Sequence, residues 1–187
     1  QPRGGRDGKG SLVIQADGRE GLEGWWQKPF PVQAGRHYRF TAFRRAEHVP
    51  APRRNVVVRL LWQDAAGKPV PADEPIVKDE LLLGGWKANA EPEFPYDRQT
   101  DGAGWTEVSG TYRAPAKATR AVAELHLQWA TGGRVEWSAV ALDETTAPPG
   151  RKVRLAAVHF RPKGGKTPMD NCRLFAPLIA AAARQKA

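Results

Sequence analysis

Polar side chains that could bind a ligand alternate with apolar ones in two stretches, Asn55–Asp64 and Thr119–Trp129. Such alternation is typical of half-buried β-strands, so the polar side chains share the exposed face of a predicted sheet. This face and its surroundings supply six candidate binding residues: Phe43, Arg59, Gln63, Glu124, His126 and Gln128. Planar rings stack on sugars, and Arg, Glu and Gln form directional hydrogen bonds, so the mixture suits a glycan. An ordinary solvated sheet face explains the pattern equally well.

A long segment without periodicity supplies two further candidates. Residues 68–103 are rich in proline and contain the apolar run Leu81–Leu83. Trp86 within this segment and Trp105 just after it could belong to a ligand-binding loop, because long irregular segments are often functional. The alternative is an ordered loop whose aromatic side chains pack on the flank of the protein.

Other motifs that could do chemistry fail on spacing. The run Gly164–Thr167 resembles part of a phosphate-binding loop, but Phe160 occupies the position of the first required glycine. No Cys or His pair has the spacing of metal ligands, and no nucleophile is paired with a base. Cys172 is expected on the packed face of a helix, where a thiol is inert. We therefore expect no catalytic residue, no metal and no cofactor in this sequence.

The charge distribution argues against nucleic-acid binding. The formal net charge is +9, but the excess of Lys and Arg lies in residues 151–187 and the rest of the chain is almost neutral. A neutral domain lacks the basic surface that binding to phosphates requires. No apolar run approaches the roughly 18 residues that span a bilayer, so no membrane-spanning segment is expected.

The elements that must position the candidate residues are short antiparallel strands. Alternation broken by turn residues runs from Ser11 to Asp143. We predict strands at Ser11–Gln15, Trp25–Val32, His37–Arg45, Asn55–Asp64, Gly104–Arg113, Thr119–Trp129 and Arg134–Leu142. Pro29 and Pro31 predict an edge position for the second of these strands, because proline has no N–H to donate. The pattern is that of a mainly β protein, with a jelly-roll or β-sandwich domain over residues 10–144 and a flexible N-terminus at residues 1–9.

The pattern changes after a linker at residues 145–151. Lys152–Phe160 is more continuously apolar and predicts a strand covered on both faces, as in α/β domains. Thr167, Pro168 and Asp170 predict a helix start with a capping box, and Pro177 predicts a kink further along the helix. One strand and one helix cannot bury a core. Residues 152–187 are therefore expected to be the incomplete start of an α/β domain that continues beyond Ala187 or finds its partner elsewhere.

The stretch from Gly10 to Glu144 resembles the jelly-roll carbohydrate-binding modules, most clearly in Gly24–Phe40 and Gly104–Leu142. The resemblance implies a module that binds a glycan or a cell-surface polymer. Many such modules end in an Asp-Asp-Val strand that helps to hold a structural calcium ion. Here the corresponding residues are Trp137–Val140, so a calcium site is not expected. The module type, together with a chain that begins at Gln1, suggests an extracellular or periplasmic protein.

The C-terminal segment resembles the opening of the carbon–nitrogen hydrolase (nitrilase) superfamily. Lys152–Pro162 is similar to its first strand, with His159 in place of a frequent Gln, and Asn171 with the following residues is similar to its first helix. The family has an α-β-β-α fold and hydrolyses amides or nitriles with a Glu-Lys-Cys triad. None of the three triad residues corresponds to a residue of this sequence.

Three functions remain open at this point. The first is a non-catalytic accessory binding module of a larger carbon–nitrogen hydrolase, with homo-oligomerisation through that enzyme. The second is a stand-alone carbohydrate-binding module, whose binding would not depend on residues 151–187. The third is a structural or oligomerisation domain without a ligand.

Overall fold

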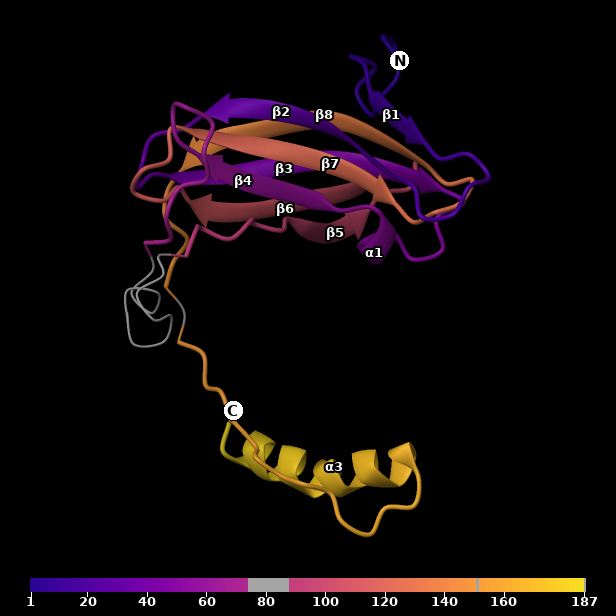
Figure 1. Cartoon of the computed structure of the whole chain (residues 1–187), viewed down its shortest axis with the longest axis vertical. Coiled ribbons are helices and arrows are strands. Elements are labelled where there is room, and N and C mark those ends of the chain that lie inside the picture. The colour runs from indigo at the N-terminus through magenta and orange to yellow at the C-terminus, as the bar shows by residue number, and fades with distance from the viewer. Residues whose placement is uncertain (74–87, 151, 187) are drawn as a thin grey trace. The chain divides into compact units, whose positions relative to one another are not determined.

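The computed structural model describes residues 1–73, 88–150 and 152–186 (Figure 1). The chain divides into two compact units, Gln1–Pro148 and Pro149–Ala187, which are described separately. The first unit contains the strands β1 (Leu12–Gln15), β2 (Glu23–Pro31), β3 (His37–Glu47), β4 (Val58–Gln63), β5 (Tyr96–Thr100), β6 (Thr106–Arg113), β7 (Arg120–Gln128) and β8 (Arg134–Thr145), and the short helix α1 (Pro52–Asn55). The second unit contains the helix α3 (Pro168–Arg184).

The strands of the first unit form two antiparallel sheets that pack face to face. The five-stranded sheet has the order β1-β8-β3-β6-β5, and the three-stranded sheet has the order β2-β7-β4. Figure 1 shows β2, β7 and β4 as one layer in front of the other. The predicted β-sandwich is confirmed. The edge position of β2 is also confirmed, since β2 pairs within its sheet only with β7.

The core lies between the two sheets and is built by the alternation seen in the sequence. Phe40 of β3 and Trp137 of β8 contribute from one sheet, and Leu60 of β4 and Leu125 of β7 from the other; all four are fully buried. Residues adjacent to them along each strand point to the opposite face, because successive side chains of a strand alternate. The polar residues of β4 and β7 therefore lie on the outer face of the three-stranded sheet.

Strand β5 lies within the segment that the sequence pattern left irregular. It pairs with β6 at the edge of the larger sheet. Its Asp97 accepts two hydrogen bonds from the guanidinium of Arg44, at 3.1 and 2.6 Å. The side chain of Arg44 is only 7% exposed, so this ion pair fixes β5 against β3.

The N-terminal residues, expected to be a flexible segment at residues 1–9, hydrogen-bond to β8. The backbone N–H of Gly5 donates to Oε1 of Glu136 at 3.1 Å, and the N–H of Arg6 donates to Oγ of Ser138 at 3.0 Å. The hydroxyl of Ser11 also donates to Oε1 of Glu136, at 2.6 Å. The carboxylate of Glu136 is buried beneath these residues.

The second unit consists of an extended segment followed by α3. The prediction of a strand at Lys152–Phe160 is wrong: these residues have no regular secondary structure in the described part of the unit. A strand needs a neighbouring strand for its backbone hydrogen bonds, and this unit supplies none in its described residues. Phe160 instead packs edge-to-face on Phe175 of α3, with ring centroids 5.2 Å apart.

The predicted start of α3 is confirmed. Thr167 is the N-cap and Asp170 N–H donates to its Oγ1 at 3.1 Å, while the N–H of Thr167 donates to Oδ2 of Asp170 at 3.1 Å. The helix continues through Pro177 as far as Arg184. None of its residues is buried. Across the described residues, no helix combines the length and hydropathy needed to cross a membrane.

Candidate functional site

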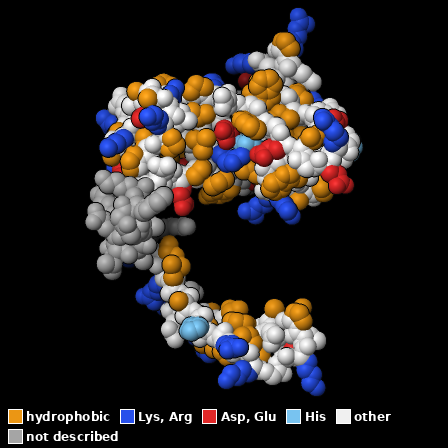
Figure 2. All heavy atoms as spheres, viewed as in Figure 1, with side chains coloured by type: hydrophobic (Ala, Val, Ile, Leu, Met, Phe, Trp, Pro, Cys, Tyr) orange, Lys and Arg blue, Asp and Glu red, His pale blue; other side chains and the backbone are white. Residues whose placement is uncertain are grey.

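A cluster of charged side chains surrounds His126 on the outer face of the three-stranded sheet. Nδ1 of His126 lies 2.9 Å from Oε1 of Glu23, and Nε2 lies 3.1 Å from Oε2 of Glu124. Arg59 donates from Nε to Nε2 of His126 at 3.1 Å and from Nη2 to Oε1 of Glu23 at 3.1 Å. The cluster joins all three strands of the sheet. Figure 2 shows acidic, basic and histidine side chains gathered among hydrophobic ones over β2, β7 and β4.

The strand register places these residues together. Trp25 of β2 is opposite His126 of β7, and Arg59 of β4 is opposite Glu124 of β7. Glu23 is opposite Gln128, one pleat along the same face. Side chains directly opposite each other on an antiparallel pair point to the same face, so three strands bring their polar residues to one surface.

Each ring nitrogen of His126 faces both a carboxylate and the guanidinium of Arg59. Nε2 lies 3.1 Å from Oε2 of Glu124 and 3.1 Å from Nε of Arg59, and Nδ1 lies 2.9 Å from Oε1 of Glu23 and 3.2 Å from Nη2 of Arg59. Which ring nitrogen carries a proton decides the donor in each contact with a carboxylate. Nε of Arg59 also lies 3.5 Å from Oε2 of Glu124. These contacts hold the two carboxylates and the guanidinium in place.

Trp25 covers this cluster with an aromatic plate. Its indole stacks on the imidazole of His126, with centroids 5.3 Å apart and planes inclined by 23°. His126 is 1% exposed, whereas Trp25 is 51% exposed. One face of the indole thus rests on a fixed ring while much of the side chain remains open to solvent. An exposed aromatic plate beside fixed hydrogen-bonding groups is suited to the apolar face and the hydroxyl groups of a sugar.

Three other predicted residues lie elsewhere on the sandwich. Gln63 shares the outer face of β4 with Arg59 but lies two pleats along the strand, opposite Arg120. Gln128 donates from Nε2 to the carbonyl of Arg54 at 2.9 Å, at the end of the sheet. The expected place of Phe43 beside these residues is wrong, because β3 belongs to the other sheet; there the guanidinium of Arg6 lies 4.3 Å from its ring centroid.

The two tryptophans predicted on or near a binding loop differ in what the structure says of them. The prediction that Trp105 binds a ligand is wrong, because Trp105 is only 4% exposed. The guanidinium of Arg45 lies over its ring, 4.9 Å from the centroid. Trp86 lies outside the described residues.

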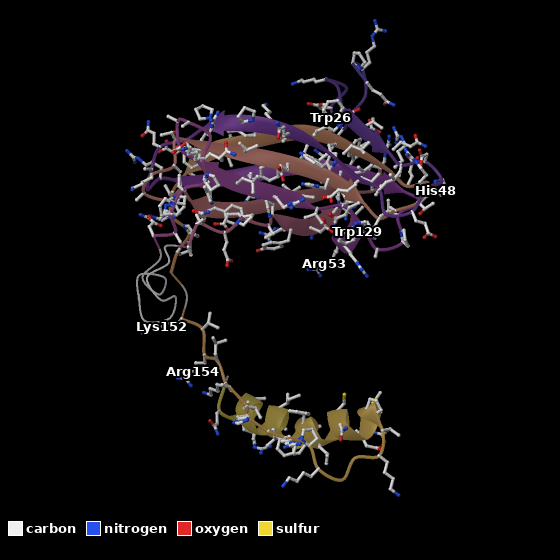
Figure 3. The ribbon with its side chains drawn as sticks, in the orientation of Figure 1. Trp26, His48, Arg53, Trp129, Lys152 and Arg154 are labelled. Carbon is white, nitrogen blue, oxygen red and sulfur yellow. The ribbon has the colours of Figure 1, made fainter. Side chains whose placement is uncertain are left out.

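Sequence reasoning did not select Glu23 and Trp25. The available signal was the pair Trp25–Trp26 in an alternating strand, which sends one ring to each face. Trp26, on the face opposite to Trp25, is not buried in the core: it is 46% exposed. Its strand is an edge strand, and β1 covers it only partly, with the indole Nε1–H donating to the carbonyl of Val13 at 3.1 Å (Figure 3).

No group of His, Cys, Asp and Glu in the described part of the chain is arranged to hold a metal ion. In the cluster on the outer face, both ring nitrogens of His126 already face protein side chains.

Comparison with known proteins gives a fold and no family. No protein-family model matches the chain, and no curated protein matches it. Among solved structures, the enzymatically active domain of tailspike protein 4 from bacteriophage CBA120 is similar over 76% of this chain, with a TM-score of 0.50 and 12% identity. The first unit is a jelly-roll β-sandwich. The matching region spans 16% of the tailspike chain, so the likeness of the jelly roll concerns the fold alone.

Two carbohydrate-binding modules are also similar to the jelly roll. A family 4 module has a TM-score of 0.45 and 16% identity, and the match covers 75% of this chain and 73% of the module. A family 16 module has a TM-score of 0.48 and 10% identity, and the match covers 75% of this chain and 81% of the module.

Proposed function

We propose that the jelly roll is a glycan-binding module and that the outer face of β2, β7 and β4 is its binding surface. The observation that carries the proposal is the stacking of half-exposed Trp25 on buried His126. A sugar ring would lie on the free face of the indole, with its hydroxyl groups directed to Glu23 and Arg59 at the border of the cluster.

The fixed positions of these groups favour binding. Trp25 loses little side-chain freedom on contact with a ligand, because its ring already rests on His126. Glu23 and Arg59 are each about one-third exposed in their side chains, so they have unoccupied hydrogen-bonding positions that face solvent. Preorganised aromatic and polar groups of this kind give affinity without the cost of ordering a loop.

The resemblance of residues 10–144 to carbohydrate-binding modules supports the same function. The resemblance rests on the stretches Gly24–Phe40 and Gly104–Leu142. The names of the structural neighbours agree with it but concern those proteins.

A glycan panel tested against two matched variants examines the proposal. Trp25→Ala removes the indole from the outer face, and Trp26→Ala removes the neighbouring half-exposed indole from the same strand. We expect Trp25→Ala to weaken binding about fivefold or more, since stacking of an aromatic ring is worth about 1 kcal/mol or more and positions the remaining contacts. Trp26→Ala should retain it. Equal affinity of both variants and the wild type would contradict the proposed surface. Failure of the wild type to bind any glycan, together with self-association, would favour the structural alternative.

A second candidate adds to the first: the jelly roll is the accessory module of a carbon–nitrogen hydrolase. The resemblance of residues 152–187 to the opening of that superfamily is its basis, and α3 has a complete capping box yet buries none of its residues, with Met169 and Ile179 exposed. Such a helix requires a further packing partner. Sequencing the gene downstream of the codon for Ala187 tests this candidate. A strand ending in Pro-Glu, followed by a Lys and a Cys, would support it, and a stop codon at that point would exclude it.

A further inference from the structure

Trp129 directly follows β7 and exposes its indole to solvent. Its backbone conformation is energetically unfavourable. Its φ is 55°, in the left-handed region that bulky side chains rarely adopt, and its side chain is 51% exposed. Strain of this kind persists only where the surrounding structure enforces it, and it is concentrated at functional sites.

Hydrogen bonds from two directions enforce this conformation. The N–H of Trp129 donates to the carbonyl of Leu22 at 2.8 Å. The buried amide of Asn55 donates from Nδ2 to the carbonyls of Gln128 and Trp129, at 3.1 and 3.4 Å, and its Oδ1 accepts from the N–H of Ala51 at 3.1 Å. Asn55 therefore ties the end of β7 to α1 and fixes the backbone that carries the indole.

A cation lies over this indole. The guanidinium of Arg54 is 5.7 Å from the ring centroid of Trp129. Within the described residues, neither Arg54 nor the adjacent Arg53 forms an ion pair with a carboxylate. Figure 3 shows Trp129 close to the helix that carries Arg53. An aromatic plate and guanidinium groups without a protein anion thus occur together.

Gln128 links the backbone of Arg54 to the surface around Trp25. Gln128, whose Nε2 donates to the carbonyl of Arg54, is opposite Glu23 of the charged cluster. Trp129 directly follows Gln128, the last residue of β7, which lies two positions beyond His126, or about 7 Å along the strand. A ligand that contacts both indoles must therefore be longer than a single sugar ring.

We propose that Trp129 and Arg54 form a second subsite that selects a carboxylated sugar, so that the ligand is an acidic oligosaccharide containing uronic acid. This inference rests on the proposed glycan-binding function. The indole of Trp129 stacks on the apolar face of the sugar ring. The guanidinium of Arg54 binds the carboxylate of the sugar, because its planar set of N–H donors matches the two carboxylate oxygens. Glu23 and Glu124 repel a ligand carboxylate, so the carboxylate binds at this end of the surface, away from the charged cluster.

The test compares uronate oligosaccharides with their carboxyl-reduced forms by isothermal titration calorimetry on the full chain. Oligogalacturonate, oligomannuronate and a glucuronate-substituted xylan are each paired with the neutral form made by reducing the carboxyl group to an alcohol. We expect at least one acidic form to bind about tenfold more tightly than its neutral partner, as one charge-assisted hydrogen bond supplies.

Three variants assign the preference to the subsite. Arg54→Gln should remove the tenfold preference while leaving the affinity for the neutral form unchanged. Trp129→Asn introduces a residue that tolerates the left-handed backbone and should weaken the binding of both the acidic and the neutral form. Lys117→Gln removes an exposed positive charge at the opposite end of β7 and should leave the preference intact. Thermal unfolding confirms that each variant folds.

The outcomes separate this inference from the proposed function. Binding that requires Trp25 but shows equal affinity for acidic and neutral forms would overturn the acidic subsite and leave the glycan-binding module standing. A preference lost equally in Lys117→Gln and Arg54→Gln would reduce it to general charge attraction and would also overturn it. Failure of every glycan to bind would overturn both.

Discussion

The indole of Trp25 and the imidazole of His126 lie face to face on the outside of the smaller sheet, with centroids 5.3 Å apart. Their strands pair in antiparallel register with these two residues opposite each other. Since His126 is buried, it does not reach a ligand; it supports Trp25 from below and anchors Glu23 and Glu124 at its two nitrogens. Trp25 is thus the exposed part of the surface, and buried His126 holds it in position.

The alternation of β4 predicts losses of stability of unequal size for two adjacent leucines. Leu60 is fully buried between the sheets, whereas Leu61 lies on the outer face. Leu60→Ala should lower the free energy of unfolding by about 3 kcal/mol, because it leaves a cavity in the core. Leu61→Ala should lower it by about 1 kcal/mol or less. Urea denaturation measures both, and equal losses would show that β4 does not have this orientation.

The buried ion pair between Arg44 and Asp97 predicts that loss of Asp97 alone strongly lowers the stability of the fold. Asp97→Ala leaves the guanidinium of Arg44 buried and unpaired, and should cost about 3 kcal/mol of unfolding free energy. The double variant Arg44→Met/Asp97→Ala should recover much of this loss, because no buried charge remains. A double-mutant cycle by chemical denaturation measures the coupling. Additive losses would indicate that the pair does not fasten β5.

Glu136 predicts a stability change at acidic pH. Burial alone would raise the pKa of its carboxyl group, but hydrogen bonds from Ser11, Arg45 and Gly5 outweigh burial and hold the pKa at about 2. The folded pKa lies below the ordinary value of 4.5, so the carboxylate stabilises the fold above about pH 4.5, and this contribution is lost as the pH falls towards 2.

Glu136→Gln should therefore lower the free energy of unfolding by about 3 kcal/mol at pH 7 and by little near pH 2. Urea denaturation of wild type and variant across this range gives the difference at each pH. Ser11→Ala, which removes one of the donors to this carboxylate, should show a smaller loss in the same direction. A difference that does not change with pH would contradict the assigned role of the carboxylate.

The sequence was sufficient for the strands whose side chains alternate. In β4 and β7 the alternation identifies both the buried face that includes Leu60 and the outer face that includes Arg59 and His126. It was insufficient for β5, because Asp97–Thr100 is polar without alternation, and the strand is held by pairing with β6 and by Arg44.

The candidate site could be predicted only in part for the same reason. Glu23 joins His126 across 103 positions of the chain, and no local pattern encodes that pairing. Phe43 lies at an alternating position of its strand, but alternation does not indicate to which sheet the strand belongs. Lys152–Phe160 has the composition of a buried strand, but the described residues offer it no neighbouring strand.

The most direct test of the central claim follows the indole N–H signals of the chain by NMR during titration with a glycan that it binds. The binding surface proposed here predicts a saturable shift of the Trp25 signal, while the signals of buried Trp62 and Trp137 stay in place. Assignment by Trp25→Phe identifies the signal. Saturable binding that leaves the Trp25 signal unmoved would contradict the account and place the ligand on another part of the protein.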